Sequence, residues 1–535
     1  MNKKIMKKAF WGLFIAWNVL ILYIVSGKQE AKKIDENTQN TQLVNKNIQQ
    51  TSSKKIAVSK YNYINTELET DVAKFKFLNN KLNCVELKKY TEHDKKIAKT
   101  ILKDESIEVV WSNQAPDINA KWSIKKQNNT VIMQHTNKNN ITFIQQWTID
   151  KYSINVATKV LNNSAHTIKT QASLIANKKA FEKHQSFIFS GISICADKKI
   201  KNFKLGKINN ANAMNAQTGW CAFNEKYWLV AAISKNATQF NAQETKSNET
   251  ISYQIRAINQ EQEIHAKSSA QNTFDLYTGP KELKELQHFG TQTNTRNIEN
   301  IIDYGWLFFM TKPVHYVLDL LIENLGVIFA LILLTLILKL MTWPFTTSSH
   351  RSAQRMHAIS PQINELRARY KETPAVMNKE IHALYKKHGI NPLGGCLPSF
   401  VQMIMVFPLY KVLSFNINLY GASFPFWIKD LSMPDPTSFF NLFGLLPFAA
   451  PDFLHIGLWP VLMGVTSIVQ QKLSSAPIPD EQKMMMYMLP VLFTWIMASL
   501  PAGVVIYWTL TNAFTIAQIM WINYTDKDIQ KVRKK

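Results

Sequence analysis

One lysine lies in the middle of a segment that is otherwise apolar. Residues 331–345 read LILLTLILKLMTWPF, which is typical of part of a membrane-spanning helix, and Lys339 is the only charged residue among them. A charge at the centre of a bilayer costs about 2.5–3.5 kcal/mol on insertion scales. Lys339 therefore needs either water around its ammonium group or a route by which its stem reaches the headgroups.

Polar and aromatic side chains recur in the other apolar segments. Thr335 lies one helical turn before Lys339 and shares its helix face. Candidates to line a common groove are Gln402, Gln470, Tyr507, Trp508 and Asn512. Further polar residues in these segments are Thr466, Ser467, Gln471, Thr511, Thr515 and Gln518. None of the apolar segments contains Asp or Glu, so we favour a water-filled groove around Lys339 and keep snorkelling as the alternative.

Motifs for enzymatic chemistry are absent from the sequence. It contains no GxSxG, HExxH or GxxxxGK[ST] motif and no pair of carboxylates within an apolar segment. Cys84, Cys195, Cys221 and Cys396 form no CxxC and no zinc spacing. We expect buried thiols, with a Cys195–Cys221 disulfide as the alternative. The prediction is a protein that is not an enzyme and uses no cofactor and no metal.

The charge balance indicates a membrane partner. The chain has 62 Lys and Arg against 38 Asp and Glu, a formal charge of +24. Because it has no zinc-ligand spacing, RNP-like motif or basic recognition helix, we expect no DNA partner. Basic residues beside membrane spans fix topology instead. The mean hydropathy of −0.15 averages a polar first half and an apolar second half.

The first half is predicted to contain three parts. Residues 1–27 carry lysines and then an apolar run, which indicates an uncleaved transmembrane anchor, with a signal peptide as the alternative. Residues 28–60 are polar and predict a flexible linker. Residues 61–300 hold many segments that alternate apolar and polar residues, as in YSINVATKV at 152–160. Such segments predict a large β-sandwich.

The second half is predicted to cross the membrane five times. Residues 301–325 are aromatic and amphipathic, which favours a helix at the membrane surface. The predicted spans are 326–346, 397–417, 458–474, 485–500 and 503–524. Between and after them lie a helical hairpin (347–396), an outer loop (418–457), a short cytoplasmic loop (475–484) and a basic tail (525–535). The predicted fold class is therefore a polytopic α-helical membrane protein with six transmembrane helices and an all-β domain.

The hairpin at 347–396 is strongly basic. Its exposed charges are predicted to include Arg351, Arg355, Arg367, Arg369, Lys386 and Lys387. By the positive-inside rule this hairpin and both termini are cytoplasmic, and the β domain lies on the other side. Its apolar residues recur every three or four positions, which predicts two antiparallel helices. The hairpin is either a structural cap or a docking surface for an anionic partner such as lipid headgroups or ribosomal RNA.

Four stretches resemble the YidC/Oxa/Alb family of membrane protein insertases. They are DLYTGPKEL (275–283), TLILKLMTWPFT (335–346), NPLGGCLPSFVQMIMVFPLY (391–410) and LPAGVVIYWTLTN (500–512). The resemblance covers nearly the whole chain. It implies a protein of the bacterial inner membrane with a five-helix insertase core. It also implies a periplasmic domain folded as a galactose-mutarotase-like super-sandwich.

The resemblance also implies a mechanism. In this family a groove open to the cytoplasm and to lipid holds a positive residue that attracts the polar part of an incoming segment, while the apolar part slides into lipid. Lys339 matches that position, where Gram-negative members usually have Arg, and Thr335 and Trp508 resemble substrate-contacting positions. The implied partners are nascent membrane proteins, the ribosome, Sec translocon components and anionic phospholipids. A small-solute transporter and an envelope assembly scaffold are the alternatives.

Overall fold

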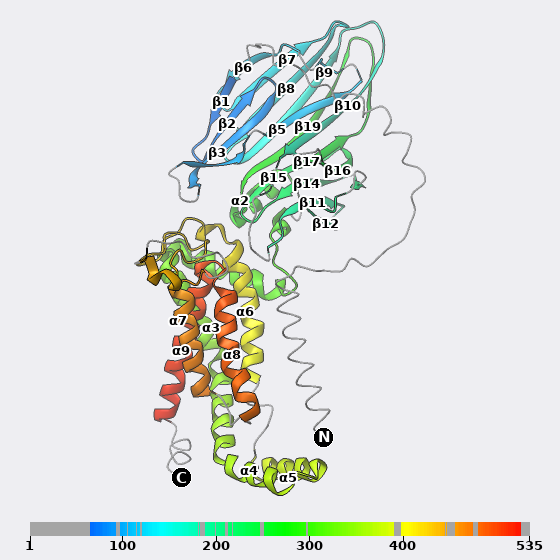
Figure 1. The fold of residues 1–535 in the computed structure, drawn as a ribbon. Coiled ribbons are helices and arrows are strands. Elements are labelled where there is room, and N and C mark those ends of the chain that lie inside the picture. The colour runs from blue at the N-terminus through cyan, green and yellow to red at the C-terminus, as the bar shows by residue number, and fades with distance from the viewer. Residues whose placement is uncertain are drawn as a thin grey trace.

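The computed structural model describes most of residues 65–525. The gaps are residues 93–96, 104, 114, 118–119, 180, 182–187, 198, 209–211, 217, 247–250, 296–297, 390–396, 445, 447–454 and 475–479. The predicted anchor at 1–27, the predicted linker at 28–60 and nearly all of the predicted tail at 525–535 lie outside the described residues. The described chain forms a β domain followed by a helical region (Figure 1).

Two antiparallel sheets pack face to face in the described part of the β domain. The ten-stranded sheet runs β1 (Asn65–Glu69), β2 (Ala73–Leu78), β3 (Lys81–Thr91), β5 (Ser106–Ser112), β10 (Ile168–Lys178), β17 (Ile251–Asn259), β16 (Ala237–Lys246), β13 (Asn212–Asn215), with β4 (Ala98–Leu102) on β3 and β18 (Gln262–Ile264) on β10. The nine-stranded sheet runs β12 (Lys199–Lys204), β11 (Gly191–Ala196), β14 (Gly219–Asn224), β15 (Trp228–Ser234), β19 (Ser268–Pro280), β9 (Ser153–Asn162), β8 (Ile141–Asp150), β7 (Thr130–Thr136), β6 (Ser123–Gln127). The predicted β-sandwich is confirmed.

Alternation along the strands builds the core of the sandwich. In β9, Ile154, Val156, Thr158 and Val160 are buried while the residues that alternate with them are more exposed. Across the sheets, the rings of Phe77 and Trp147 meet edge to face with centroids 5.5 Å apart. β15 is buried along its whole length, as expected for a strand covered on both faces.

The two central cysteines point to opposite faces of their sheet. Cys195 pairs with Trp220 and Cys221 pairs with Ile194, so adjacent positions on each strand carry the two thiols. Successive side chains of a strand alternate between faces, which prevents a disulfide between them. Both thiols are buried and reduced, as expected from the sequence.

The helical region contains long helices and a short hairpin. Its helices are α3 (Phe308–Ala358), α4 (Ser360–Arg369), α5 (Pro374–Lys387), α6 (Leu397–Phe415), α7 (Leu458–Ser474), α8 (Asp480–Met497) and α9 (Ala502–Thr525). Among the described residues, α3 and α9 are long and apolar enough to cross a membrane. Shorter apolar stretches at Val406–Phe415 and Tyr487–Met497 lie in α6 and α8.

The helix α3 has a break at 326, where the predicted span begins, and continues past 346, where that span was predicted to end. Its backbone breaks at Gly326, where φ is 77° and ψ is 166°, a conformation that only glycine adopts readily. Beyond the break the helix continues without interruption to Ala358. The hydroxyl groups of Thr342, Thr346 and Thr347 donate to carbonyls four residues back. These polar residues therefore stay in the helix and do not end it.

An aromatic contact joins the β domain to the helical region. Tyr420, just after α6, places its ring among those of Tyr90, Tyr227 and Trp228, with centroid distances of 6.2, 5.3 and 5.1 Å. Its hydroxyl donates to the carbonyl oxygen of Thr91 at 3.0 Å. The β domain is thereby fixed above the outer ends of the helices (Figure 1).

Charged side chains are buried in the β domain near this junction. Lys178 lies 3.5 Å from both Glu105 and Glu225. Burial raises the pKa of Glu105 to about 7, although Lys178 acts in the opposite direction. Lys281 donates to the Oδ1 atom of Asn224 at 3.0 Å, and burial lowers the pKa of Lys281 to about 7.

These two shifts predict how stability depends on pH. Below its ordinary pKa an unfolded Lys281 stays protonated, whereas the folded protein loses that proton near pH 7. The unfolded state therefore binds more protons between pH 7 and about 10, and stability should rise with pH in that window. For Glu105 the sign is reversed: the folded state holds the extra proton between about pH 4.5 and 7, so stability should fall there as pH rises.

The measurement is the melting temperature of the full chain in detergent from pH 5 to about 10. In Lys281→Met the rise above pH 7 should be smaller than in the wild type. The same slope in both proteins would show that Lys281 keeps its proton when folded.

Candidate functional site

Lys339 is held against the neighbouring helix α9. Its half-buried ammonium donates to the Oγ1 atom of Thr515 at 2.5 Å. One turn further along both helices, Gln518 donates to the carbonyl oxygen of Trp343 at 3.2 Å. The helices run side by side here, and the ammonium lies against α9 at the depth of its own helical turn.

A cavity of about 260 Å³ lies beside Lys339 between α3 and α9. Its lining residues are Leu336, Lys339, Leu340, Trp343, Phe514, Ala517, Gln518 and Trp521. The rings of Trp343 and Trp521 lie 6.0 Å apart. Among the predicted site residues whose side chains the structure describes, Lys339 alone lines this cavity. Its walls are mainly apolar, so a polar occupant would find Lys339 and Gln518 as partners.

The predicted residue Asn512 faces a different helix, α7. Its amide donates to the hydroxyls of Ser467 at 2.8 Å and Thr466 at 3.1 Å. Asn512 and Thr515 lie one turn apart on α9. A row of polar groups therefore crosses the bundle from α3 to α7. We call Lys339, Thr515, Asn512, Ser467 and Thr466 the polar seam.

The other predicted residues lie around this seam or apart from it. Trp508, one turn before Asn512, packs on Phe493 of α8 with ring centroids 4.8 Å apart. Tyr507 is buried and Gln470 is half-buried one turn beyond Thr466 and Ser467. Thr335 is fully buried, and its hydroxyl donates to Leu331 within its own helix, so it does not face a groove. Gln402 belongs to α6, but its side chain lies outside the described residues.

Sequence reasoning noted Thr515 only as one of several polar residues. A helical spacing of four and three connects Trp508, Asn512 and Thr515 on one face, and this pattern could have selected Thr515. The apolar walls beside Lys339 were missed entirely. Trp343 and Trp521 carry no signal that separates a cavity wall from a lipid-facing or interfacial ring.

The basic hairpin extends beyond the bundle at the end opposite the β domain (Figure 1). Ile359 and Ile363 pack against a set of partly buried residues, namely Met356, Ile381, Leu384 and Tyr385. This packing holds α4 on α5. The six predicted docking residues are all exposed: Arg351, Arg355, Arg367, Arg369, Lys386 and Lys387. The residue Arg369 also pairs with Glu365 at 2.9 Å.

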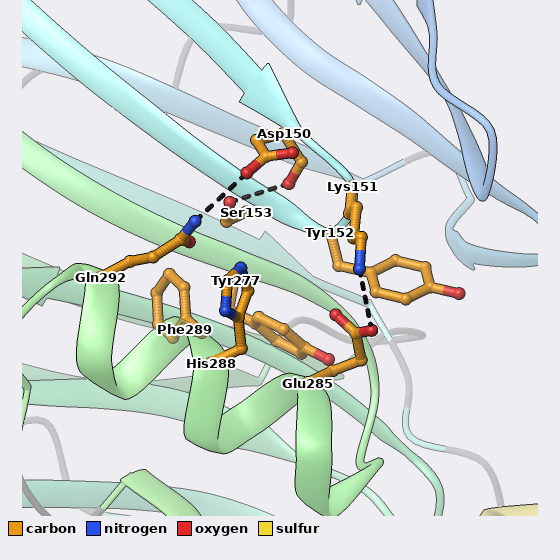
Figure 2. A pocket seen from close by; sticks show the side chains of 9 residues that line it. All are labelled: Asp150, Lys151, Tyr152, Ser153, Tyr277, Glu285, His288, Phe289 and Gln292. Atoms are coloured by element: carbon orange, nitrogen blue, oxygen red, sulfur yellow. Dashed lines mark hydrogen bonds and ion pairs between the residues drawn. The ribbon is translucent and has the colours of Figure 1, made fainter.

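A small hollow in the β domain lies between α2 (Leu283–Gln292) and the turn from β8 to β9 (Figure 2). Lys151 lies 3.4 Å from Glu285 across it, and Gln292 donates to Asp150 at 3.3 Å. Its volume of about 10 Å³ holds roughly one water molecule. These contacts attach α2 to the sheet and leave no room for a ligand.

Comparison with known proteins matches both parts of the chain. Residues 65–317 match the model of the YidC periplasmic domain, and residues 318–530 match that of the 60Kd inner membrane protein. The chain is 34% identical over 402 residues to the membrane protein insertase YidC of Rickettsia bellii, which covers 73% of this chain and 72% of that protein. It is 34% identical over 400 residues to the YidC of Rickettsia akari, with 72% and 71% covered.

A solved structure of an active YidC insertase with its first transmembrane domain covers 86% of this chain and 92% of that chain, with 14% identity and a TM-score of 0.37. The two family matches and the Rickettsia relatives confirm the resemblance found in the sequence. The chain belongs to the YidC family of membrane protein insertases, which are not enzymes, and it carries that family's periplasmic and inner-membrane parts.

Proposed function

We propose that Lys339 receives the polar part of an incoming membrane protein in a hydrated space between the helices, while the apolar part passes into lipid. The observation that carries this proposal is the half-buried ammonium bonded to Thr515. An ammonium has three N–H donors, and Thr515 uses one of them. The others remain for water or for a carboxylate of the substrate.

The surroundings of Lys339 strengthen such an attraction. No Asp or Glu lies in the predicted spans, so no protein carboxylate within them competes for the ammonium. The walls of the adjacent cavity are mainly apolar, and Coulomb attraction grows as the local dielectric falls. A short acidic segment of a client is therefore the cargo that gains most from this position. Because Lys lacks the planar fork of Arg, it binds a carboxylate as a point charge.

The apolar part of the client needs a path of its own. The outer surface of α8 exposes a row of apolar side chains, namely Met488, Val491, Leu492 and Trp495. Trp508 packs against α8 and lies one turn from Asn512 of the polar seam. We propose that the exposed apolar row of α8 is the path along which the apolar part of the client moves from the polar seam into lipid.

The hairpin formed by α4 and α5 is the proposed docking surface on the cytoplasmic side. Its exposed basic residues suit the ribosome, with anionic phospholipids as neighbours. His350 Nε2 lies 2.8 Å from Asn523 Oδ1, so the end of α9 is on the same side as the hairpin. We propose that both termini are cytoplasmic and the β domain periplasmic. Clients then arrive directly from the ribosome or from the Sec translocon.

Replacing Lys339 should slow insertion of clients with short acidic translocated segments. Loss of about 1 kcal/mol of attraction corresponds to a roughly fivefold slower rate in Lys339→Ala. Lys339→Arg should keep the rate because it keeps the charge. The measurement is protease protection of such a client in proteoliposomes, with a client whose acidic residues are neutralised as the control. Unchanged insertion in both Lys339→Ala and Lys339→Glu would contradict the proposal.

A photoreactive residue at position 508 should capture nascent chains. Trp508 is half-buried beside the polar seam, so crosslinks should form only while an apolar segment emerges from a stalled ribosome. The matched control is position 520, because Met520 on the same helix is 60% exposed and should capture lipid. Lipid adducts alone at both positions, at every chain length, would rule out passage beside Trp508.

Neutralising Arg367, Arg369, Lys386 and Lys387 with Gln should weaken ribosome binding. Each lost phosphate contact should reduce the slope of log affinity against log salt by about 0.7–0.9. The control variant neutralises Lys125 and Lys126, which are exposed on β6 of the β domain. The measurement is co-sedimentation over a salt series. Equal slopes in the two variants would mean that the hairpin is only a structural cap.

A further inference from the structure

The described part of the loop between α6 and α7 is organised around one buried carboxylate. Asp435 is 2% exposed and accepts hydrogen bonds from Trp427 Nε1 at 3.0 Å and Thr437 Oγ1 at 2.7 Å. It also accepts from the backbone N–H of Trp459 at 2.8 Å, in the first turn of α7. A Cβ on Gly457 would lie 2.5 Å from Asp435, so only glycine fits there. Asp435 therefore fixes Trp427 at the outer end of α7.

Aromatic rings gather at this end of α7. The rings of Trp427 and Trp459 lie 6.1 Å apart, and that of Phe424 lies 5.7 Å from Trp459. Tryptophan at the end of a membrane helix is typical of the headgroup level. Lys429 is exposed nearby and is suited to a lipid phosphate. These residue types are the ones expected of a loop at the headgroups of a membrane.

Among the described residues of this loop, Phe426 is the most exposed large apolar residue. Its side chain is 86% exposed and its backbone has a φ of 79°. A bulky residue with positive φ is strained, and such strain persists only where the surroundings hold it. The bond from Phe424 N to Ile428 O closes the turn, and Trp427 is tied to Asp435. The turn thus leaves the ring of Phe426 largely exposed, beside the ring of Trp427 at a centroid distance of 5.9 Å.

A second tip of the same loop has the same features. It comprises Phe439, Phe440 and Leu442, which are 51%, 42% and 48% exposed, and Leu442 has a φ of 50°. In the described β domain, the residues other than glycine with positive φ are all Asn, Asp or Lys, which are polar. The turns of this loop instead expose Phe and Leu, whose side chains gain free energy when an apolar phase covers them.

We propose that Phe426 and the tip at 439–442 insert into the outer leaflet of the bilayer and anchor the loop there. The opposite side of this loop carries Tyr420, which is docked among the aromatic rings of the β domain. Lipid contact on one side of the loop is thereby coupled to the position of the β domain on the other. This anchor is independent of the path through Lys339.

The test places benzoylphenylalanine at Phe426 or Phe440 of the full chain in liposomes of phosphatidylethanolamine and phosphatidylglycerol. The control position is Ile97, which is 60% exposed on the β domain. After irradiation, mass spectrometry should find lipid adducts at positions 426 and 440 about tenfold more often than at 97. This ratio is the one expected when a Phe side chain moves from water into the apolar part of the bilayer. Equal adduct levels at the three positions, or adducts to protein in place of lipid, would overturn the proposal.

A second variant separates lipid contact from folding. Asn tolerates positive φ, so Phe426→Asn should fold with an unchanged or higher melting temperature. With the crosslinker at position 440, this substitution should reduce lipid adducts severalfold, because the loop loses one of its two insertions. If the lipid adducts at position 440 were as frequent as in the wild type, Phe426 would not help to insert the loop into lipid, and the proposal would be refuted.

Discussion

An ammonium group inside a membrane must have polar partners, and this constraint explains the composition of the helices around Lys339. The bond to Thr515 satisfies one donor and requires α9 to be polar on the face toward α3. The next polar residue on α9, Asn512, then needs partners of its own and finds them on α7. The polar seam thus bonds α3 to α9 through Lys339 and α9 to α7 through Asn512, and it holds these three helices in register.

The two ends of the molecule are built for different surroundings. At the outer end, aromatic rings around Tyr420 and an ion pair of 2.6 Å between Lys411 and Asp303 fasten the β domain to the helices. At the other end, α4 and α5 share a small apolar contact around Ile363 and expose their charges. The outer end is therefore sealed by extensive packing, while the hairpin remains accessible to large partners.

Periodicity predicted much of the fold but not the neighbours of the site. The alternation of apolar and polar residues in 152–160 predicted β9, and the single charge of Lys339 in an apolar segment indicated the site. Both signals can be read from neighbouring residues of the sequence. The partner of Lys339 is not local: helical spacing selects a face of α9, yet it cannot say which helix that face meets. Thr335 shares a face with Lys339, but it is buried and its hydroxyl donates to a carbonyl of its own helix. The continuation of α3 past 346 was equally hidden, because the polar residues that follow Phe345 read as the end of a span. Their hydroxyls bond back to their own helix, which continues.

The break at Gly326 divides α3 into two segments with different attachments. Before it, the helix is tied to the β domain and outer loop through an ion pair of 2.5 Å between Lys284 and Glu323 and a hydrogen bond of 2.7 Å from Asn416 to Asp319. After it, the helix carries Lys339. A Cβ at Gly326 would meet no atom within 4 Å, so the backbone angle, and not a close neighbour, favours glycine here. Gly326 therefore separates a segment that is attached to the β domain from a segment that carries Lys339 and is bonded to α9.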